Sequence, residues 1–227
     1  DQTYFLSRIG QKALSKSLFP IGELEKSKVR EIAEKNELYT AKKKDSTGVC
    51  FIGERDFDAF LDKYLLSKKG DMINVDTGKK ISQHHGLYHY TLGQRKGIGI
   101  GGVGSGEPWF VVGKDLKKNL LYVAQGEQHE ALYSTSLIGE APAWTLDEEP
   151  VFPLHCTAKF RYRQQDIPVT VHKMEDGNLH IVYDNPVKAV TPGQVAVLYD
   201  ADICLGSSII KSIEPVNSKY KYLNPTF

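Results

Sequence analysis

Apolar side chains follow two different spacings along this chain, and the first of them is helical. Val29, Ile32 and Ala33 stand three and four positions apart. The same spacing recurs further on, in Phe57, Phe60, Leu61, Tyr64 and Leu65, and stops at Lys68-Lys69-Gly70. Residues spaced in this way lie on one face of a helix, where they can pack against a core. The first third of the chain is therefore expected to hold two short amphipathic helices.

From Asp71 the spacing of apolar residues changes to two, which is typical of strands. Met72 to Val75 and Lys80-Ile81 flank the turn residues Asp76-Thr77-Gly78. The runs WFVVG and LLYVA flank a second polar turn over residues 114–119. Two short alternating runs joined by such a turn predict a β-hairpin. Two hairpins are therefore expected between residues 71 and 125.

Beyond Leu132 the apolar runs are short and separated by turn residues such as Asp176-Gly177-Asn178. No helical spacing interrupts them. The six runs are LYSTSLIG, PLHCTAKFRYR, IPVTVHKM, LHIVYD, QVAVLYD and CLGSSIIKSIE. Six short strands without intervening helices predict an all-β barrel or sandwich.

These patterns predict a multidomain chain that combines α+β and all-β parts. We expect the end of an α/β domain at residues 1–55, a small mixed α+β central domain at 56–128 and a β-barrel at 129–213. A tail at 214–227 is expected to fray or to pack as an appendage. The first residues, DQTYFLSRIG, begin without Met and without the basic and apolar segments of a signal peptide, so we expect a fragment of a longer protein.

Composition narrows the possible functions without choosing one. Of the 227 residues, 41% are hydrophobic and 25% charged, and the formal net charge is +1. These values are ordinary for a globular protein, and no apolar run is long enough to span a membrane. Three cysteines without a CxxC pair predict neither a disulfide scaffold nor a zinc site, and we expect no metal. A reducing, cytoplasmic setting fits this cysteine content.

Cys50 lies in the segment KKKDSTGVCFIGERDF. A cysteine between Val49 and Phe51 would ordinarily be a small buried hydrophobic residue. Here three lysines precede it within eight positions and Arg55 follows it. Nearby cations lower the pKa of a thiol and populate the nucleophilic thiolate. Cys50 is therefore the candidate reactive sulfur, whereas Cys156 and Cys204 lie in strand-like runs and are expected to be buried.

The glycine-rich segment between Gly93 and Pro108 contains a formal GxGxxG match. A dinucleotide-binding motif of this kind follows a strand and opens a helix, but this one leads into WFVVG, a predicted strand. We therefore interpret it as a loop that carries Arg95 and Lys96, suited to phosphates or to close packing. The nearby histidines, His84, His85 and His89, lack carboxylate or thiolate partners at metal-ligand spacing and are expected to be polar loop residues.

The segment KFRYRQ has two interpretations that its residues do not separate. Strand alternation would place Lys159, Arg161 and Arg163 on one face and Phe160 and Tyr162 on the other. The cations then form either a solvated face over aromatic core residues or a ridge that binds phosphates beside an aromatic ring.

The sequence resembles a known family along nearly its whole length. The matching blocks are DQTYFL, LFPIGELEKSKVREIA, AKKKDSTGVCFIGERDF, GLYHYTLGQRKGIGIGG, WFVVGKD, CTAKFRYRQ and AVTPGQVAVLYD. They resemble the tRNA-specific 2-thiouridylases, the MnmA/TrmU family. This resemblance implies that residues 1–55 end an α/β adenine-nucleotide hydrolase-like domain, and that the barrel is six-stranded and antiparallel.

The resemblance also implies an activity and the residues that carry it. Enzymes of this family use ATP, with Mg²⁺, to adenylate the wobble uridine of lysine, glutamate and glutamine tRNAs. A cysteine persulfide then displaces AMP, and a cysteine desulfurase or sulfur-relay protein supplies the sulfur. The persulfide carrier falls on Cys50. Residues that contact tRNA in the family fall on Asp1, Gln2, Arg161, Tyr162 and Gln194, and we add Arg95 and Lys96 from the glycine-rich loop.

Two parts of the family pattern are missing from these residues. The Ser-Gly-Gly-x-Asp-Ser phosphate loop that binds ATP does not occur, and neither does the first of the two catalytic cysteines, which together close a disulfide bond in the cycle. No ATP-binding residue is therefore expected in this chain, and the chain by itself is expected to be inactive. The alternatives are a non-catalytic RNA-binding barrel and an RNA methyltransferase. A redox protein is disfavoured because no CxxC pair is present.

Overall fold

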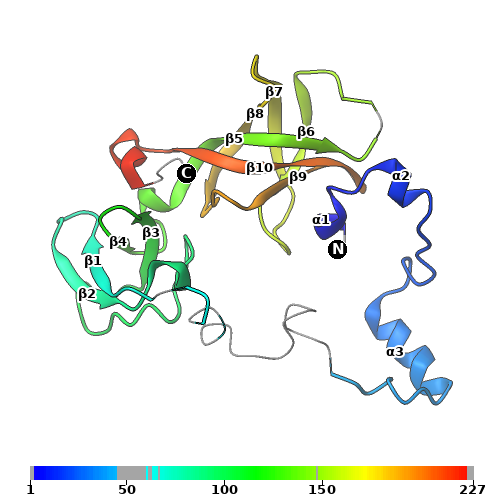
Figure 1. Cartoon of the computed structure of the whole chain (residues 1–227), viewed down its shortest axis with the longest axis horizontal. Helices are drawn as coiled ribbons and strands as arrows, with labels where there is room; N and C mark the ends of the chain where they lie inside the picture. Colours follow the sequence, from blue (N-terminus) through cyan, green and yellow to red (C-terminus); the bar gives the residue numbers. More distant parts are fainter. Residues whose placement is uncertain (1–2, 45–59, 61–62, 66, 147, 224–227) are drawn as a thin grey trace. The chain divides into compact units, whose positions relative to one another are not determined.

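The computed structural model describes residues 3–44, 60, 63–65, 67–146 and 148–223 (Figure 1). The chain divides into two compact units. One unit consists of Asp1–Gln11 and Ser67–Phe227, and the other consists of Lys12–Leu66. Cys50, Asp1 and Gln2 lie outside the described residues.

The smaller unit contains α3, Lys26–Lys35, which is the first helix that the apolar spacing predicts. The Arg30 guanidinium donates to the carbonyl oxygens of Ala41 and Lys43, at 3.1 and 3.2 Å, and so fastens the following segment to the helix. Most of the second predicted helix, at Phe57 to Leu65, lies outside the described residues. Two further short helices precede α3 in the chain: α1, Thr3–Leu6, and α2, Gln11–Leu14.

A four-stranded sheet in the larger unit contains both predicted hairpins. Its strands are β1 (Gly70–Asn74), β2 (Lys80–His84), β3 (Trp109–Asp115) and β4 (Leu120–Gln125), in the order β2-β1-β4-β3. β1 and β2 pair antiparallel, as do β3 and β4, which confirms the hairpins. The hairpins join through a parallel pairing of β1 with β4 that local patterning did not predict.

Both faces of this sheet are covered. On one face the 3-10 helix η1, Leu87–His89, and the glycine-rich loop pack over Met72, Val111 and Val123. On the other face lies the tail, where η3, Ser218–Leu223, buries Tyr220 and Leu223. A Cβ on Gly113 would lie 2.7 Å from the Leu223 Cβ, so only glycine allows this contact. The described part of the tail, up to Leu223, is therefore packed against the sheet and not frayed.

The larger unit also contains a closed barrel of six antiparallel strands, and this confirms the predicted fold (Figure 1). Its order is β10-β5-β8-β7-β6-β9. In chain order the strands are β5 (Tyr133–Trp144), β6 (Leu154–Lys159), β7 (Ile167–Lys173), β8 (Leu179–Lys188), β9 (Val195–Asp200) and β10 (Ile203–Pro215), and η2, Glu130–Leu132, precedes them. Alternating residues fill the interior, including Phe160, Ile181 and Leu198. Closure leaves the barrel no unpaired edge.

The expectation that the three histidines are polar loop residues is wrong for His84. This residue ends β2 and is 1% exposed, and its Nε2 lies 3.1 Å from the carbonyl oxygen of Asn119. Burial lowers the pKa of its imidazole. The rings of His85 and His89 lie 4.4 Å apart. Among the described residues, no group of three or more His, Cys, Asp or Glu side chains could hold a metal ion.

Helices of the described ranges are all too short or too polar to cross a membrane.

Candidate functional site

The segment KFRYRQ does not continue as a strand. β6 ends at Lys159, and a turn follows in which Arg163 has a φ of 68°. The expected alternation is therefore wrong, because the strand ends before Arg161 and Arg163 and the chain turns there. Lys159 lies 3.7 Å from Asp166, while Arg161 points elsewhere. The three cations do not form one ridge.

Arg161 links the loop after η1 to the barrel. Its Nη2 donates to the carbonyl oxygens of Leu92 and Ala189, at 2.7 and 2.9 Å, and to Thr191 Oγ1 at 3.2 Å. Burial lowers the pKa of the guanidinium, but an arginine stays charged at neutral pH. Charge-assisted hydrogen bonds are stronger than neutral ones, so this single nitrogen holds two segments 69 and 28 residues away in sequence.

Glycine at position 93 makes this junction possible. Gly93 has a φ of 77°, and a Cβ placed there would lie 2.4 Å from the Ala189 Cβ. No side chain fits at that distance. The backbone of the glycine-rich segment therefore touches the barrel beside the carbonyl that Arg161 holds.

Tyr162 faces the other way, toward the first helix. Its ring is 36% exposed and lies 4.7 Å from the ring of Phe5 and 6.2 Å from that of Tyr4. The Tyr4 hydroxyl donates to the Val195 carbonyl at 3.2 Å, and burial raises its pKa. Neighbouring residues Arg161 and Tyr162 thus connect α1, the barrel and the loop after η1.

The loop that carries Arg95 and Lys96 is anchored on β3. Gly93 N donates to the Val111 carbonyl at 2.8 Å, and Val111 N donates back to the Gln94 carbonyl at 3.0 Å. The Gln94 side chain accepts from Thr91 N and donates to the carbonyl of Lys96. Arg95 and Lys96 remain exposed at the tip of this ordered turn. The backbone that presents these two cations is thus fixed by hydrogen bonds.

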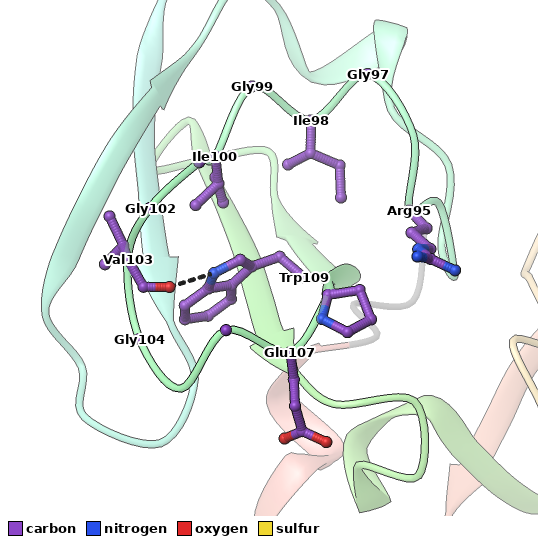
Figure 2. Close-up of a pocket in the computed structure, with 13 residues that line it drawn as sticks. Arg95, Gly97, Ile98, Gly99, Ile100, Gly102, Val103, Gly104, Glu107 and Trp109 are labelled. Atoms are coloured by element: carbon purple, nitrogen blue, oxygen red, sulfur yellow. Dashed lines mark hydrogen bonds between the residues drawn. The ribbon is translucent and has the colours of Figure 1, made fainter.

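The glycine-rich segment continues around a pocket of about 660 Å³ (Figure 2). Ile98, Ile100 and Trp109 lie inside the loop, whereas Glu107 points away from it (Figure 2). Trp109 Nε1 donates to the Val103 carbonyl at 3.1 Å and closes the loop over the indole. The chain continues into β3 and opens no helix, which confirms that the GxGxxG match is no dinucleotide motif.

A second pocket, of about 260 Å³, lies where the sheet, the barrel loop and the tail meet. Gln194 is exposed at this pocket, and Lys114 of β3 and Tyr88 of η1 also line it. The family resemblance had implied Gln194 as a site residue, whereas the sequence analysis did not single out Lys114. A lysine at the end of an apolar strand, at the edge of WFVVGKD, is the signal that could have indicated it.

Cys156 and Cys204 are both free thiols and both half-buried. Burial, with a smaller contribution from the nearby carboxylate of Asp200, raises the pKa of Cys156 to about 11. Burial also raises the pKa of Cys204. Neither thiol is ionised at neutral pH, so neither has the character of a nucleophile.

We expect Cys156 to react slowly with iodoacetamide at pH 7.5 and faster as the pH rises. Because the thiolate is the reacting form, its rate should increase about tenfold per pH unit until the pH approaches the raised pKa. Timed alkylation with mass-spectrometric peptide mapping measures this rate for all three cysteines. A Cys156 rate that levels off below pH 9 contradicts the buried environment, and labelling of Cys156 or Cys204 ahead of Cys50 contradicts the choice of reactive sulfur.

Comparison with known proteins places these features in a family. Three family models match successive segments: "tRNA methyl transferase HUP domain" at residues 1–54, "tRNA methyl transferase PRC-barrel domain" at 58–125 and "aminomethyltransferase beta-barrel domain" at 134–210. The tRNA-specific 2-thiouridylase MnmA of Listeria monocytogenes strain EGD-e is 53% identical over 223 residues. Those residues are 98% of this chain and 59% of that relative. The chain belongs to the tRNA-specific 2-thiouridylase family.

Other members of the 2-thiouridylase family give the same result. MnmA 2 of Geobacillus kaustophilus and MnmA of Geobacillus thermodenitrificans are each 54% identical over 223 residues, again 98% of this chain and 59% of the relative. The chain thus spans less than two thirds of the length of these relatives. The resemblance that the sequence motifs carry is confirmed, and the methyltransferase and non-catalytic alternatives are not favoured.

Proposed function

We propose that this chain is part of an enzyme that transfers sulfur to tRNA and makes 2-thiouridine at the anticodon wobble position. One observation carries the proposal: relatives named tRNA-specific 2-thiouridylases share 53–54% of its residues over 98% of its length. The proposal assigns the persulfide to Cys50, which stands among lysines in a block shared with the family.

The proposed reaction uses two thiols, that of Cys50 and a second one that forms a disulfide with it. ATP, with Mg²⁺, transfers AMP to the C2 oxygen of uridine and releases pyrophosphate. The terminal sulfur of the Cys50 persulfide bonds to C2, and AMP leaves with the former carbonyl oxygen. A second thiolate then attacks the Cys50 sulfur, which closes a disulfide and leaves the terminal sulfur on the base. Cations near Cys50 favour the thiolate that accepts the incoming sulfur.

Seven residues of this chain are proposed to bind tRNA. They are Asp1, Gln2, Arg161, Tyr162, Gln194, Arg95 and Lys96. Two exposed cations at the tip of the ordered loop suit phosphate oxygens. An exposed tyrosine and an exposed glutamine suit a base face and a base or sugar edge.

Arg161 differs from the other proposed contacts because its Nη2 already has three acceptors within the protein. We propose that it supports tRNA binding mainly by fixing the loop before Arg95 on the barrel.

The proposed partners follow from this function. The substrate is a tRNA with a wobble uridine of the lysine, glutamate or glutamine type, and the sulfur comes from a cysteine desulfurase or a sulfur-relay protein in the cytoplasm. We assign no ATP-binding residue within this chain. Because C2 of a stacked base is inaccessible, the uridine must leave the anticodon stack to react. We propose that three domains, at residues 1–55, 56–128 and 129–213, contribute to this function, followed by a tail at 214–227.

Deletion of the gene that encodes this chain tests the proposal. We expect 2-thiouridine to disappear from digested tRNA, because sulfur insertion has no other route in the proposed scheme. Liquid chromatography with mass spectrometry of the nucleosides measures it, and a plasmid copy of the gene is the control that should restore it. Unchanged 2-thiouridine with loss of a methylated nucleoside would replace sulfur transfer by methyl transfer.

A further inference from the structure

The pocket beside Gln194 lies entirely within the larger unit and draws on distant parts of the sequence. Its floor consists of Tyr90 and Leu223, which are 2% and 1% exposed. Its rim consists of Tyr88 from η1, Lys114 from β3 and Gln194 from the loop before β9. A buried floor with a polar rim is the usual form of a ligand site.

Charge in this pocket has one sign. Lys114 is the one cation among the residues that line it, and none of them is acidic. Burial lowers the pKa of Lys114, and within the described residues no carboxylate forms an ion pair with it. A half-buried ammonium group without an anion carries a desolvation cost that a bound anion offsets. The pocket therefore favours a ligand with a negative group.

The remaining side chains favour a nucleotide over a simple anion. Tyr88 offers an aromatic ring in the same pocket as the cation, and Gln194 offers both an amide donor and an amide acceptor. Aromatic rings stack on bases, while an amide reads a base or ribose edge. A single nucleotide of an RNA strand combines a phosphate, a base and a sugar.

The Arg161 junction supports one wall of this pocket. Thr191, which lines the pocket, accepts from Arg161 Nη2 and donates to the Ala189 carbonyl at 3.0 Å. Leu92, whose carbonyl Arg161 also holds, lines the pocket as well. The same contacts that fasten the loop to the barrel therefore set the shape of the pocket.

We propose that this pocket binds one nucleotide of the tRNA strand, with Lys114 on its phosphate, Tyr88 against its base or sugar and Gln194 on its edge. The inference rests on the proposed function and extends it, because Lys114 and Tyr88 are not among the tRNA contacts that the family resemblance implies.

Substitution of Lys114 tests the proposal. Lys114→Met keeps an unbranched side chain, one atom shorter, and removes its charge. In the 227-residue chain we expect this variant to bind an unmodified glutamate tRNA transcript about tenfold more weakly at low salt, as for loss of a charge-assisted hydrogen bond. The slope of log affinity against log salt should fall by roughly 0.7–0.9, one phosphate contact. Lys117→Met is the matched control, because Lys117 is exposed in the adjoining turn, and it should change affinity less than about twofold.

Protection of lysines provides a second readout that needs no variant. We expect tRNA to slow acetylation of Lys114 by acetic anhydride at least about threefold in the wild-type chain, as mapped by mass spectrometry. Millimolar UMP and inorganic phosphate are the comparison probes and should protect it less than tRNA does. Protection by UMP without protection by tRNA would overturn the assignment to an RNA strand.

The experiments distinguish failure of the pocket proposal from failure of the proposed function. If wild type and Lys114→Met bind tRNA equally and tRNA leaves Lys114 acetylation unchanged, the pocket is not a nucleotide site, while tRNA binding by the chain stands. If the wild-type chain binds no tRNA at low salt, the pocket proposal falls together with the tRNA contacts proposed for this chain.

Discussion

Replacing Cys50 with serine is expected to abolish 2-thiouridine formation while leaving tRNA affinity within about twofold of wild type. A serine oxygen cannot hold a terminal sulfur as a persulfide, so the sulfur has no carrier. Loss of a nucleophile typically lowers turnover by a thousandfold or more, on the order of the effects seen for other covalent enzymes. One thiol adds little to an interface made of phosphate and base contacts, so binding should persist.

The controls for this substitution are the other two thiols. Cys156→Ser and Cys204→Ser should retain thiolation, because burial raises the pKa of both thiols and keeps them protonated at neutral pH. Nucleoside mass spectrometry in cells that carry each variant measures activity, and fluorescence anisotropy with labelled tRNA measures binding. Thiolation that survives Cys50→Ser, or that is lost with Cys156→Ser in a folded protein, contradicts the assignment.

Replacing Arg161 with alanine is expected to destabilise the larger unit by roughly 2–3 kcal/mol, because three acceptors lose a charged donor and two of them are backbone carbonyls. For a unit of this size that loss lowers Tm by roughly 5–10 °C. tRNA affinity should fall because the loop that carries Arg95 loses its fixed position. The salt slope of binding should change by less than about half a unit, since Arg161 is proposed to act mainly within the protein.

Arg163→Gln is the matched control, because Arg163 is an exposed arginine in the same turn. Its guanidinium lies over the Tyr162 ring, 5.4 Å from the ring centre. It should leave Tm within about 1 °C. Differential scanning calorimetry and a salt titration of tRNA binding separate the two roles of Arg161. A salt slope that falls by a full contact, with Tm unchanged, would make Arg161 a direct phosphate ligand.

Sequence patterning predicted the elements better than it predicted their partners. Each of the six apolar runs beyond Leu132 became one barrel strand, because alternation by two is a local property that the barrel interior requires. The parallel pairing of β1 with β4 was not predictable in this way. It depends on contacts between residues about 50 positions apart, such as Met72 with Leu121.

The candidate site shows the same limit. Alternation failed after Lys159 because β6 ends there and the chain turns, with Arg163 in a left-handed conformation that the sequence pattern did not predict. Arg161 was recognisable as a cation, but its acceptors on Leu92 and Ala189 come together only when the loop and the barrel pack. Lys114 appeared as the polar end of a strand, and only the folded chain places it beside Gln194. The assignment of Cys50 as the reactive sulfur depends only on its lysine-rich sequence context and on the block that it shares with the family.

Following a labelled sulfur atom through the protein tests most directly whether Cys50 carries the transferred sulfur. The complete enzyme would be loaded with labelled sulfur by a cysteine desulfurase, digested without reductant and mapped by mass spectrometry, before and after addition of ATP and an unmodified glutamate tRNA. We expect one extra sulfur on the Cys50 peptide before addition and its recovery in 2-thiouridine afterwards. Labelled sulfur on Cys156 or Cys204, or labelled 2-thiouridine from a protein whose Cys50 never carries sulfur, would contradict it.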